Sequence, residues 1–144
     1  MGIKDANNMG AAMAPAAFDT LITHFEDTKR KPSYYDAIIT GDLGHVGKDI
    51  LSDLCKTKGY NINANYDDCG VLIFDKSKQD THSGGSGCAC IGTVFSGYFF
   101  KQLREKKINK ILLMATGALT NATTNQQGES IPGIAHAISI ENSH

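Results

Sequence analysis

Hydrophobic residues recur every three or four positions in two stretches of the chain, which is the spacing of a helix with one buried face. The first predicted helix covers about residues 15–26, and the second covers residues 46–58. Their apolar positions are Phe18, Leu21, Ile22 and Phe25 in the first, and Val46, Ile50, Leu51, Leu54 and Cys55 in the second. Gly59 follows the second stretch, as expected for a residue that ends a helix.

Short apolar runs predict four strands, over residues 34–41, 70–75, 108–117 and 134–140. The first three alternate with helical stretches, which indicates an α/β fold with mostly parallel strands and helices covering the sheet. The last two strands are joined by a polar linker, residues 118–133, without a helical pattern. We therefore expect that pair to be antiparallel, within a single domain.

A third helix is predicted from about residue 86 to residue 104, after a glycine-rich turn that begins at His82. No charged residue lies between His82 and Lys101, and small residues are mixed with valine and phenylalanine. This mixture predicts a helix packed on all sides. The stretch falls short of the roughly 20 predominantly apolar residues of a membrane span, so we expect a soluble protein.

Composition removes several classes of function. The chain has 144 residues and a formal net charge of -1, so no global field favours nucleic acid or an anionic membrane surface. Its four cysteines lack the paired spacing of a structural zinc site, and the first residues lack the pattern of a secretory signal. We therefore expect no metal and no cofactor, reduced thiols and an intracellular location.

Three glycine-containing turns follow strands or precede helices, where open α/β sheets bind ligands. They are the His82 turn, residues 116–118 and residues 42–45. For His82, a ligand site and a tight turn that needs glycine remain equally supported, whereas a purely structural turn is favoured at His45. No phosphate-binding loop or nucleophile elbow is present, and a triad that includes Ser130 and His136 stays conceivable, although His136 fits a packed core position better.

Five motifs together resemble the stage V sporulation protein AD family. They are Asn8-Met9-Gly10-Ala11-Ala12-Met13-Ala14-Pro15-Ala16, Thr40-Gly41-Asp42-Leu43-Gly44, His82-Ser83-Gly84-Gly85-Ser86-Gly87-Cys88, Ala115-Thr116-Gly117-Ala118-Leu119 and Gln126-Gln127-Gly128-Glu129-Ser130-Ile131-Pro132. The resemblance implies an α/β, thiolase-like layered fold. It also implies that residues 1–144 match only the carboxy-terminal half, with the central first strand largely missing, so that a fragment of a longer protein with exposed apolar sheet surface is expected.

The same resemblance bears on chemistry. Thiolases use a cysteine of the amino-terminal half and a second cysteine whose place falls here near Met114 or Ala115, while the histidine of ketoacyl synthases falls near Gly41 or Asp42. Without these groups we expect no catalysis, although an acyl-CoA-handling thiolase or ketoacyl-synthase-like acyltransferase remains the alternative, and a purely structural half a third possibility. Cys88 and Cys90 are interpreted as small packing residues of the helix.

The family is understood to bind dipicolinic acid and to help load it into the spore with proteins of the same operon at the inner membrane. By resemblance, a former catalytic cleft would hold this dicarboxylate, and the expected ligand-binding residues are His82, Gly84, Gly85, Ser86, Thr116 and Gly117. The expected partners are dipicolinic acid, the operon proteins, an amino-terminal thiolase-like half and a second copy in a homodimer, with no nucleic acid. The expected location is peripheral to the spore inner membrane.

Overall fold

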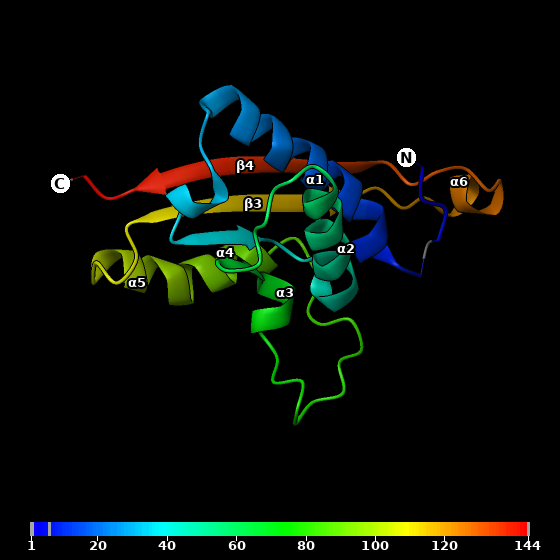
Figure 1. Cartoon of the computed structure of the whole chain (residues 1–144). Coiled ribbons are helices and arrows are strands. Elements are labelled where there is room, and N and C mark those ends of the chain that lie inside the picture. The colour runs from blue at the N-terminus through cyan, green and yellow to red at the C-terminus, as the bar shows by residue number, and fades with distance from the viewer. Residues whose placement is uncertain (1, 6, 144) are drawn as a thin grey trace.

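A four-stranded mixed sheet forms the centre of the molecule (Figure 1). In this computed structural model residues 2–5 and 7–143 are described, without the side chains of residues 124 and 125. The strands are β1 (Ala37–Thr40), β2 (Tyr66–Asp68), β3 (Lys110–Ala118) and β4 (Gly133–Glu141), in the order β2-β1-β3-β4. β1 is parallel to both β2 and β3, and β4 is antiparallel to β3. The predicted mixed, mostly parallel α/β sheet and its antiparallel last pair are confirmed.

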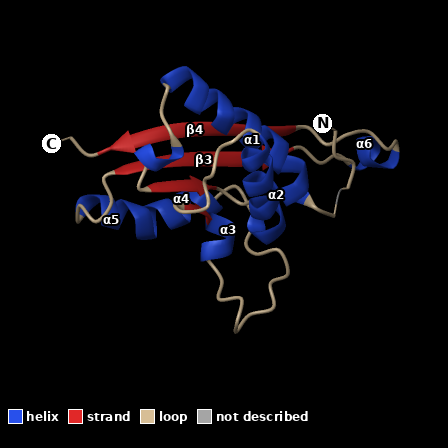
Figure 2. Ribbon diagram, viewed as in Figure 1, coloured by secondary structure: helices blue, strands red, loops and turns tan. Residues whose placement is uncertain are grey.

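Two long helices, α1 (Met9–Thr28) and α2 (Gly44–Thr57), cover one face of the sheet (Figure 2). Their apolar side chains, including Leu21, Phe25 and Leu51, pack against Ile38, Leu112 and Met114 of the strands. α1 begins six residues before its predicted start because the side chain of Asn8 accepts a hydrogen bond from the Ala11 N–H and caps the first turn.

The other face is covered by α3 (Cys69–Leu72), α4 (Cys90–Val94), a π-helical turn (Phe95–Phe99) and α5 (Phe100–Arg104). Cys90, Val94, Phe99 and Leu103 face the sheet and are buried. The opposite side of this segment is exposed, with Tyr98 54% and Phe100 49% accessible. The expectation of a helix packed on all sides is therefore wrong for this chain, because nothing in its described residues covers the outer side.

The predicted strand over residues 70–75 is also wrong. The strand is β2, residues 66–68, and the apolar run after it starts α3. The carboxylate of Asp68 accepts a hydrogen bond from the Gly70 N–H and caps this helix. A short apolar run does not by itself distinguish a strand from a helix turn, and the cap decides here.

The remaining elements are short. A 3-10 turn (Pro32–Tyr34) ends at the first residue of the strand predicted over residues 34–41, which in the structure starts only at Ala37. α6 (Ala122–Gln126) lies in the linker between β3 and β4. A long loop between α3 and α4 extends away from the sheet (Figure 1). This loop contains the glycine-rich turn.

The sheet is continuous although no strand precedes α1 among the described residues. β1 pairs directly with β3, with Ala37 opposite Ile111 and Thr40 opposite Met114. The expected exposure of apolar sheet surface is observed on the edge strand β4, where Ile134 and Ile138 are 55% and 61% accessible.

Candidate functional site

The carboxyl ends of β1, β2 and β3 meet at one edge of the sheet, because these three strands are parallel. Thr40, the last residue of β1, lies opposite Met114 of β3 and Asp68 of β2. The segments that leave these strands are held together by two aspartates, Asp42 and Asp68. This edge is where the sequence places its candidate turns.

Asp42 joins the end of β1 to β3 and to the glycine-rich turn. Its Oδ1 accepts a hydrogen bond of 2.8 Å from the Thr116 hydroxyl, and its Oδ2 accepts one of 3.1 Å from the Gly87 N–H. The Ser86 hydroxyl lies at the outer limit of a hydrogen bond, 3.5 Å from the same Oδ2. The Asp42 N–H donates in turn to Thr116 Oγ1 at 3.3 Å. Three donors from two separate segments therefore converge on one carboxylate.

Backbone hydrogen bonds fix the rest of the turn. The Gly85 N–H donates to the Gly70 carbonyl at 2.7 Å, and the His45 N–H donates to the Ser83 carbonyl at 2.8 Å. Gly84 has a φ of +105° and approaches the Gly70 carbonyl so closely that a side chain would not fit. Gly84 and Gly85 thus dock the turn against α3 by their backbones, as a tight turn requires.

Asp68 is fully buried and accepts four hydrogen bonds. Its donors are the Thr40 hydroxyl at 2.6 Å and the N–H groups of Leu43, Gly44 and Gly70, each at 2.9 Å. They belong to the end of β1, the start of α2 and the start of α3. Burial raises the pKa of Asp68 above its ordinary value, although the four hydrogen bonds act in the opposite direction.

This raised pKa predicts a pH dependence of stability. The folded state binds the Asp68 proton more tightly than the unfolded state, so protonation of this group adds stability that is fully present below its ordinary pKa of 3.8. This proton-linked part of its contribution is lost as pH rises through the raised value, while the hydrogen bonds that Asp68 accepts remain. We expect the difference in free energy of unfolding between wild type and Asp68→Asn to shift against wild type as pH rises from about 3 to about 7. Urea unfolding of both proteins measures this, and a difference that moves toward wild type would contradict it.

The six expected site residues do not form one cluster. Ser86 and Thr116 meet at Asp42, and Gly84 and Gly85 lie against α3. His82 is separate: its side chain is 88% exposed, and its Nδ1 lies 3.4 Å from Asp80 on the surface. Gly117 pairs with Ile134 within the sheet. None of the six lines any of the five hollows described on the surface.

The sequence indicated the turn over residues 42–45 as a candidate but did not single out Asp42 as a site residue, and it gave no role to Asp68. Both are acids at or shortly after the end of a strand, two residues before a glycine in the first turn of the next helix, Gly44 of α2 or Gly70 of α3. That placement is a usable signal, because a carboxylate at a strand end can accept hydrogen bonds from the free N–H groups of the segments that follow. For Asp68 this signal was missed because the strand was predicted over residues 70–75, which placed Asp68 before the strand rather than at its end.

Three smaller expectations are corrected. Cys88 precedes α4 and is exposed, so it is not a packing residue of the helix, whereas Cys90 is buried as expected. His136 is exposed rather than packed in the core, and so is Ala115, its partner on the neighbouring strand β3. Ser130 is also exposed and makes no hydrogen bond to His136 in the described structure, so no triad forms.

The buried thiols are not activated. Burial raises the pKa of Cys55 and Cys69 to about 12 and that of Cys90 to about 11, and the charges of Asp68 and Asp42 act in the same direction on Cys69 and Cys90. A thiol must be deprotonated to act as a nucleophile. Among the described residues no group of three or more His, Cys, Asp or Glu side chains is placed to hold a metal ion.

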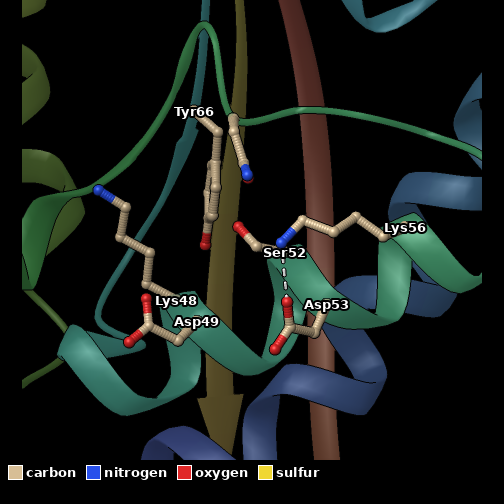
Figure 3. A pocket seen from close by; sticks show the side chains of 7 residues that line it. Lys48, Asp49, Ser52, Asp53, Lys56 and Tyr66 are labelled. Carbon is tan, nitrogen blue, oxygen red and sulfur yellow. Dashed lines mark hydrogen bonds and ion pairs between the residues drawn. The ribbon is translucent and has the colours of Figure 1, made fainter.

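A polar hollow of about 410 Å³ lies elsewhere, over the outer side of α2 (Figure 3). It is lined by Lys48, Asp49, Ser52, Asp53, Lys56, Asn63 and Tyr66. Both lysines are already ion-paired, Lys48 with Asp67 at 2.7 Å and Lys56 with Asp53 at 2.9 Å. The hollow therefore offers an anion little uncompensated positive charge.

Comparison with known proteins identifies the family. A family model described as stage V sporulation protein AD matches residues 1–141. The chain belongs to the stage V sporulation protein AD family. It is also 49% identical over 141 residues to stage V sporulation protein AD of Bacillus subtilis strain 168, a match that covers 98% of the chain and 41% of the relative. The resemblance seen in the five motifs is thus confirmed, with a role in sporulation.

The chain spans about two fifths of the length of this curated relative. Among the residues that the structure describes, no helix is both long and apolar enough to cross a membrane.

Proposed function

We propose that this member of the stage V sporulation protein AD family is a non-catalytic component that binds dipicolinic acid during sporulation. One observation carries the proposal: the Thr116 and Ser86 hydroxyls and the Gly87 N–H converge on a single carboxylate, that of Asp42. Donors arranged in this way hold a carboxylate, and dipicolinate carries two.

The other candidate residues take supporting roles in this proposal. Gly84 and Gly85 set the position of the donors by docking the turn on α3, and Gly117 continues β3 beyond Thr116. His82 precedes Ser83, whose carbonyl is held by the His45 N–H. The exposed imidazole lies apart from the Asp42 donors, beside Asp80, so its contact with the second carboxylate of the ligand is a hypothesis that substitution tests.

A non-catalytic role agrees with the chemistry of the described site. The carboxyl ends of β1 and β3 carry Asp42 and Thr116 rather than cysteine or histidine, and the buried thiols are protonated at neutral pH. An acyl-transfer enzyme needs an activated nucleophile and a proton donor. Mass spectrometry after incubation with acetyl-CoA tests this point, and a covalent acyl adduct would support the acyltransferase alternative.

The rest of a longer protein is the proposed partner of the exposed side of α4, the π-helical turn and α5. That side carries small residues beside two accessible aromatic rings, Tyr98 and Phe100. Small residues allow close approach of a second helix, and aromatic rings supply apolar contact area. We propose that an amino-terminal thiolase-like half packs on this surface. Proteins of the same operon, a second copy of the chain and the spore inner membrane are proposed as further partners.

Replacing Thr116 with valine tests the binding site. Valine keeps the shape of threonine but removes the hydroxyl, so we expect the affinity for dipicolinate to fall about tenfold by isothermal titration calorimetry. Thr57→Val is the matched control, because the Thr57 hydroxyl bonds only its own helix, at the Leu54 carbonyl.

His82→Ala is measured in the same series. We expect weaker binding if the imidazole holds the second carboxylate, and unchanged affinity would remove His82 from the site. Absence of dipicolinate binding by wild type would contradict the proposed function as a whole.

A further inference from the structure

The donors that a ligand carboxylate requires are occupied by the protein itself. Asp42 accepts from the Thr116 hydroxyl with one oxygen, and from the Gly87 N–H and the Ser86 hydroxyl with the other. An N–H group carries one hydrogen and a hydroxyl carries one, so each donor is used once. A ligand carboxylate can take these donors only when the Asp42 carboxylate leaves them.

Charge acts in the same direction. Two carboxylates that compete for one set of donors lie within a few ångströms of each other, where like charges repel strongly at a partly buried position. The negatively charged dipicolinate is therefore repelled by the Asp42 carboxylate until the Asp42 side chain rotates away from the donors. Among the described residues Asp42 has no ion-paired cation that would offset this charge.

The surrounding backbone allows the Asp42 side chain to move without loss of the loop. The next two residues, Leu43 and Gly44, are fixed by their N–H groups to the buried carboxylate of Asp68. The glycine-rich turn is fixed independently, by the hydrogen bonds of Gly85 to Gly70 and of His45 to Ser83. A change of the Asp42 side chain therefore leaves both segments attached to the sheet.

We propose that Asp42 is an internal competitor for the carboxylate site and sets its affinity and specificity. In the free protein its carboxylate holds the donors of Ser86, Gly87 and Thr116 in place. A ligand binds by displacing it, so a dicarboxylate with a second point of attachment is favoured over a monocarboxylate. This inference rests on the proposed function, because it concerns the same donors.

The test compares Asp42→Asn and Asp42→Ala with wild type in the 144-residue chain. Both variants remove the competing charge, and alanine also frees all three donors. We expect dipicolinate to bind about tenfold more tightly or better to the variants, by isothermal titration calorimetry. Asp49→Asn is the matched control, since it removes one exposed negative charge from α2 and leaves the donors of Ser86, Gly87 and Thr116 bonded to Asp42. Its affinity should stay near that of wild type.

The outcomes separate this inference from the proposed function. If wild type binds dipicolinate and the Asp42 variants bind it equally or more weakly, the inference is overturned and the proposed function stands. If the variants bind acetate, detected by a shift of the Gly87 amide resonance, but no protein binds dipicolinate, the competition by Asp42 stands, whereas its preference for a dicarboxylate and the proposed function are overturned. If the variants bind neither acid, both are overturned. Urea unfolding of each variant verifies that it is folded.

Discussion

Gly70→Ala is expected to lower the free energy of unfolding by about 2–3 kcal/mol, because the new methyl group would collide with the backbone carbonyl of Gly85. A side chain could rotate away from such a contact, but a carbonyl in a docked turn moves only with its whole segment. That movement breaks the hydrogen bond from the Gly85 N–H to the Gly70 carbonyl, which attaches the glycine-rich turn to α3. Urea unfolding followed by circular dichroism measures the loss.

Gly92→Ala is the control for this change. Gly92 lies within α4, and a methyl group there meets no atom within 4 Å outside its neighbouring residues and the backbone of its own helix. Since glycine is less favourable than alanine inside a helix, this variant should be more stable than wild type by about 0.5–1 kcal/mol. Equal stability of the two variants would show that the turn is not packed against α3 as described.

Asp68→Ala is expected to cost about 3 kcal/mol or more, measured in the same way at neutral pH. The substitution leaves the N–H groups of Leu43, Gly44 and Gly70 without an acceptor in a fully buried position, and the Thr40 hydroxyl keeps only the Tyr66 hydroxyl, at 3.0 Å, as a side-chain partner. Each buried donor without a partner carries a desolvation cost, and the cavity adds to it. The starts of α2 and α3 should lose protection from amide hydrogen exchange first.

Asp53→Ala provides the comparison. Asp53 is exposed on α2 and pairs with Lys56 at the surface, where solvent screens the interaction. We expect little change in stability from this variant. A loss at Asp68 as small as that at Asp53 would mean that the segments at the strand ends are held by other contacts.

Asp68 and Asp42 have different expected roles at this edge of the sheet. Asp68 is buried and joins β1 to the helices that follow β1 and β2, so its removal should act on stability. Asp42 is only partly buried and accepts hydrogen bonds from donors near the surface, so in the proposed function its removal acts on ligand affinity. Substitutions at these two positions therefore separate folding from binding.

The hydrophobic pattern predicts most of the secondary structure because helices and strands differ in the spacing of their apolar residues. The spacing of Leu21, Ile22 and Phe25 indicates a helix with one buried face, and all three are buried in α1. The continuous apolar run in β3 indicates a strand, and the polar linker after it predicts the antiparallel partner. Errors occur where the pattern is short, as in residues 70–75, where a capping hydrogen bond outweighs the strand preference of the apolar residues.

Of the candidate site, the sequence indicates the segments but not their partners. The turns at residues 42–45, 82–88 and 116–118 are recognisable from glycine and from their place after strands. That Asp42 accepts hydrogen bonds from both later segments depends on contacts between residues 44 to 74 positions apart. The outward position of His82 likewise depends on the path of the loop, which local sequence does not specify.

The sequence alone determined the α/β class, the antiparallel last pair, and, through its motifs, the resemblance to the sporulation family. These follow from periodicity and from short runs of neighbouring residues, which are local properties of the chain. Only the tertiary structure decided that β1 pairs directly with β3, that one side of the α4–α5 segment is exposed, and that a carboxylate of the protein occupies the candidate site. Each of these depends on which distant segments meet, because burial and hydrogen bonding are set by neighbours in space.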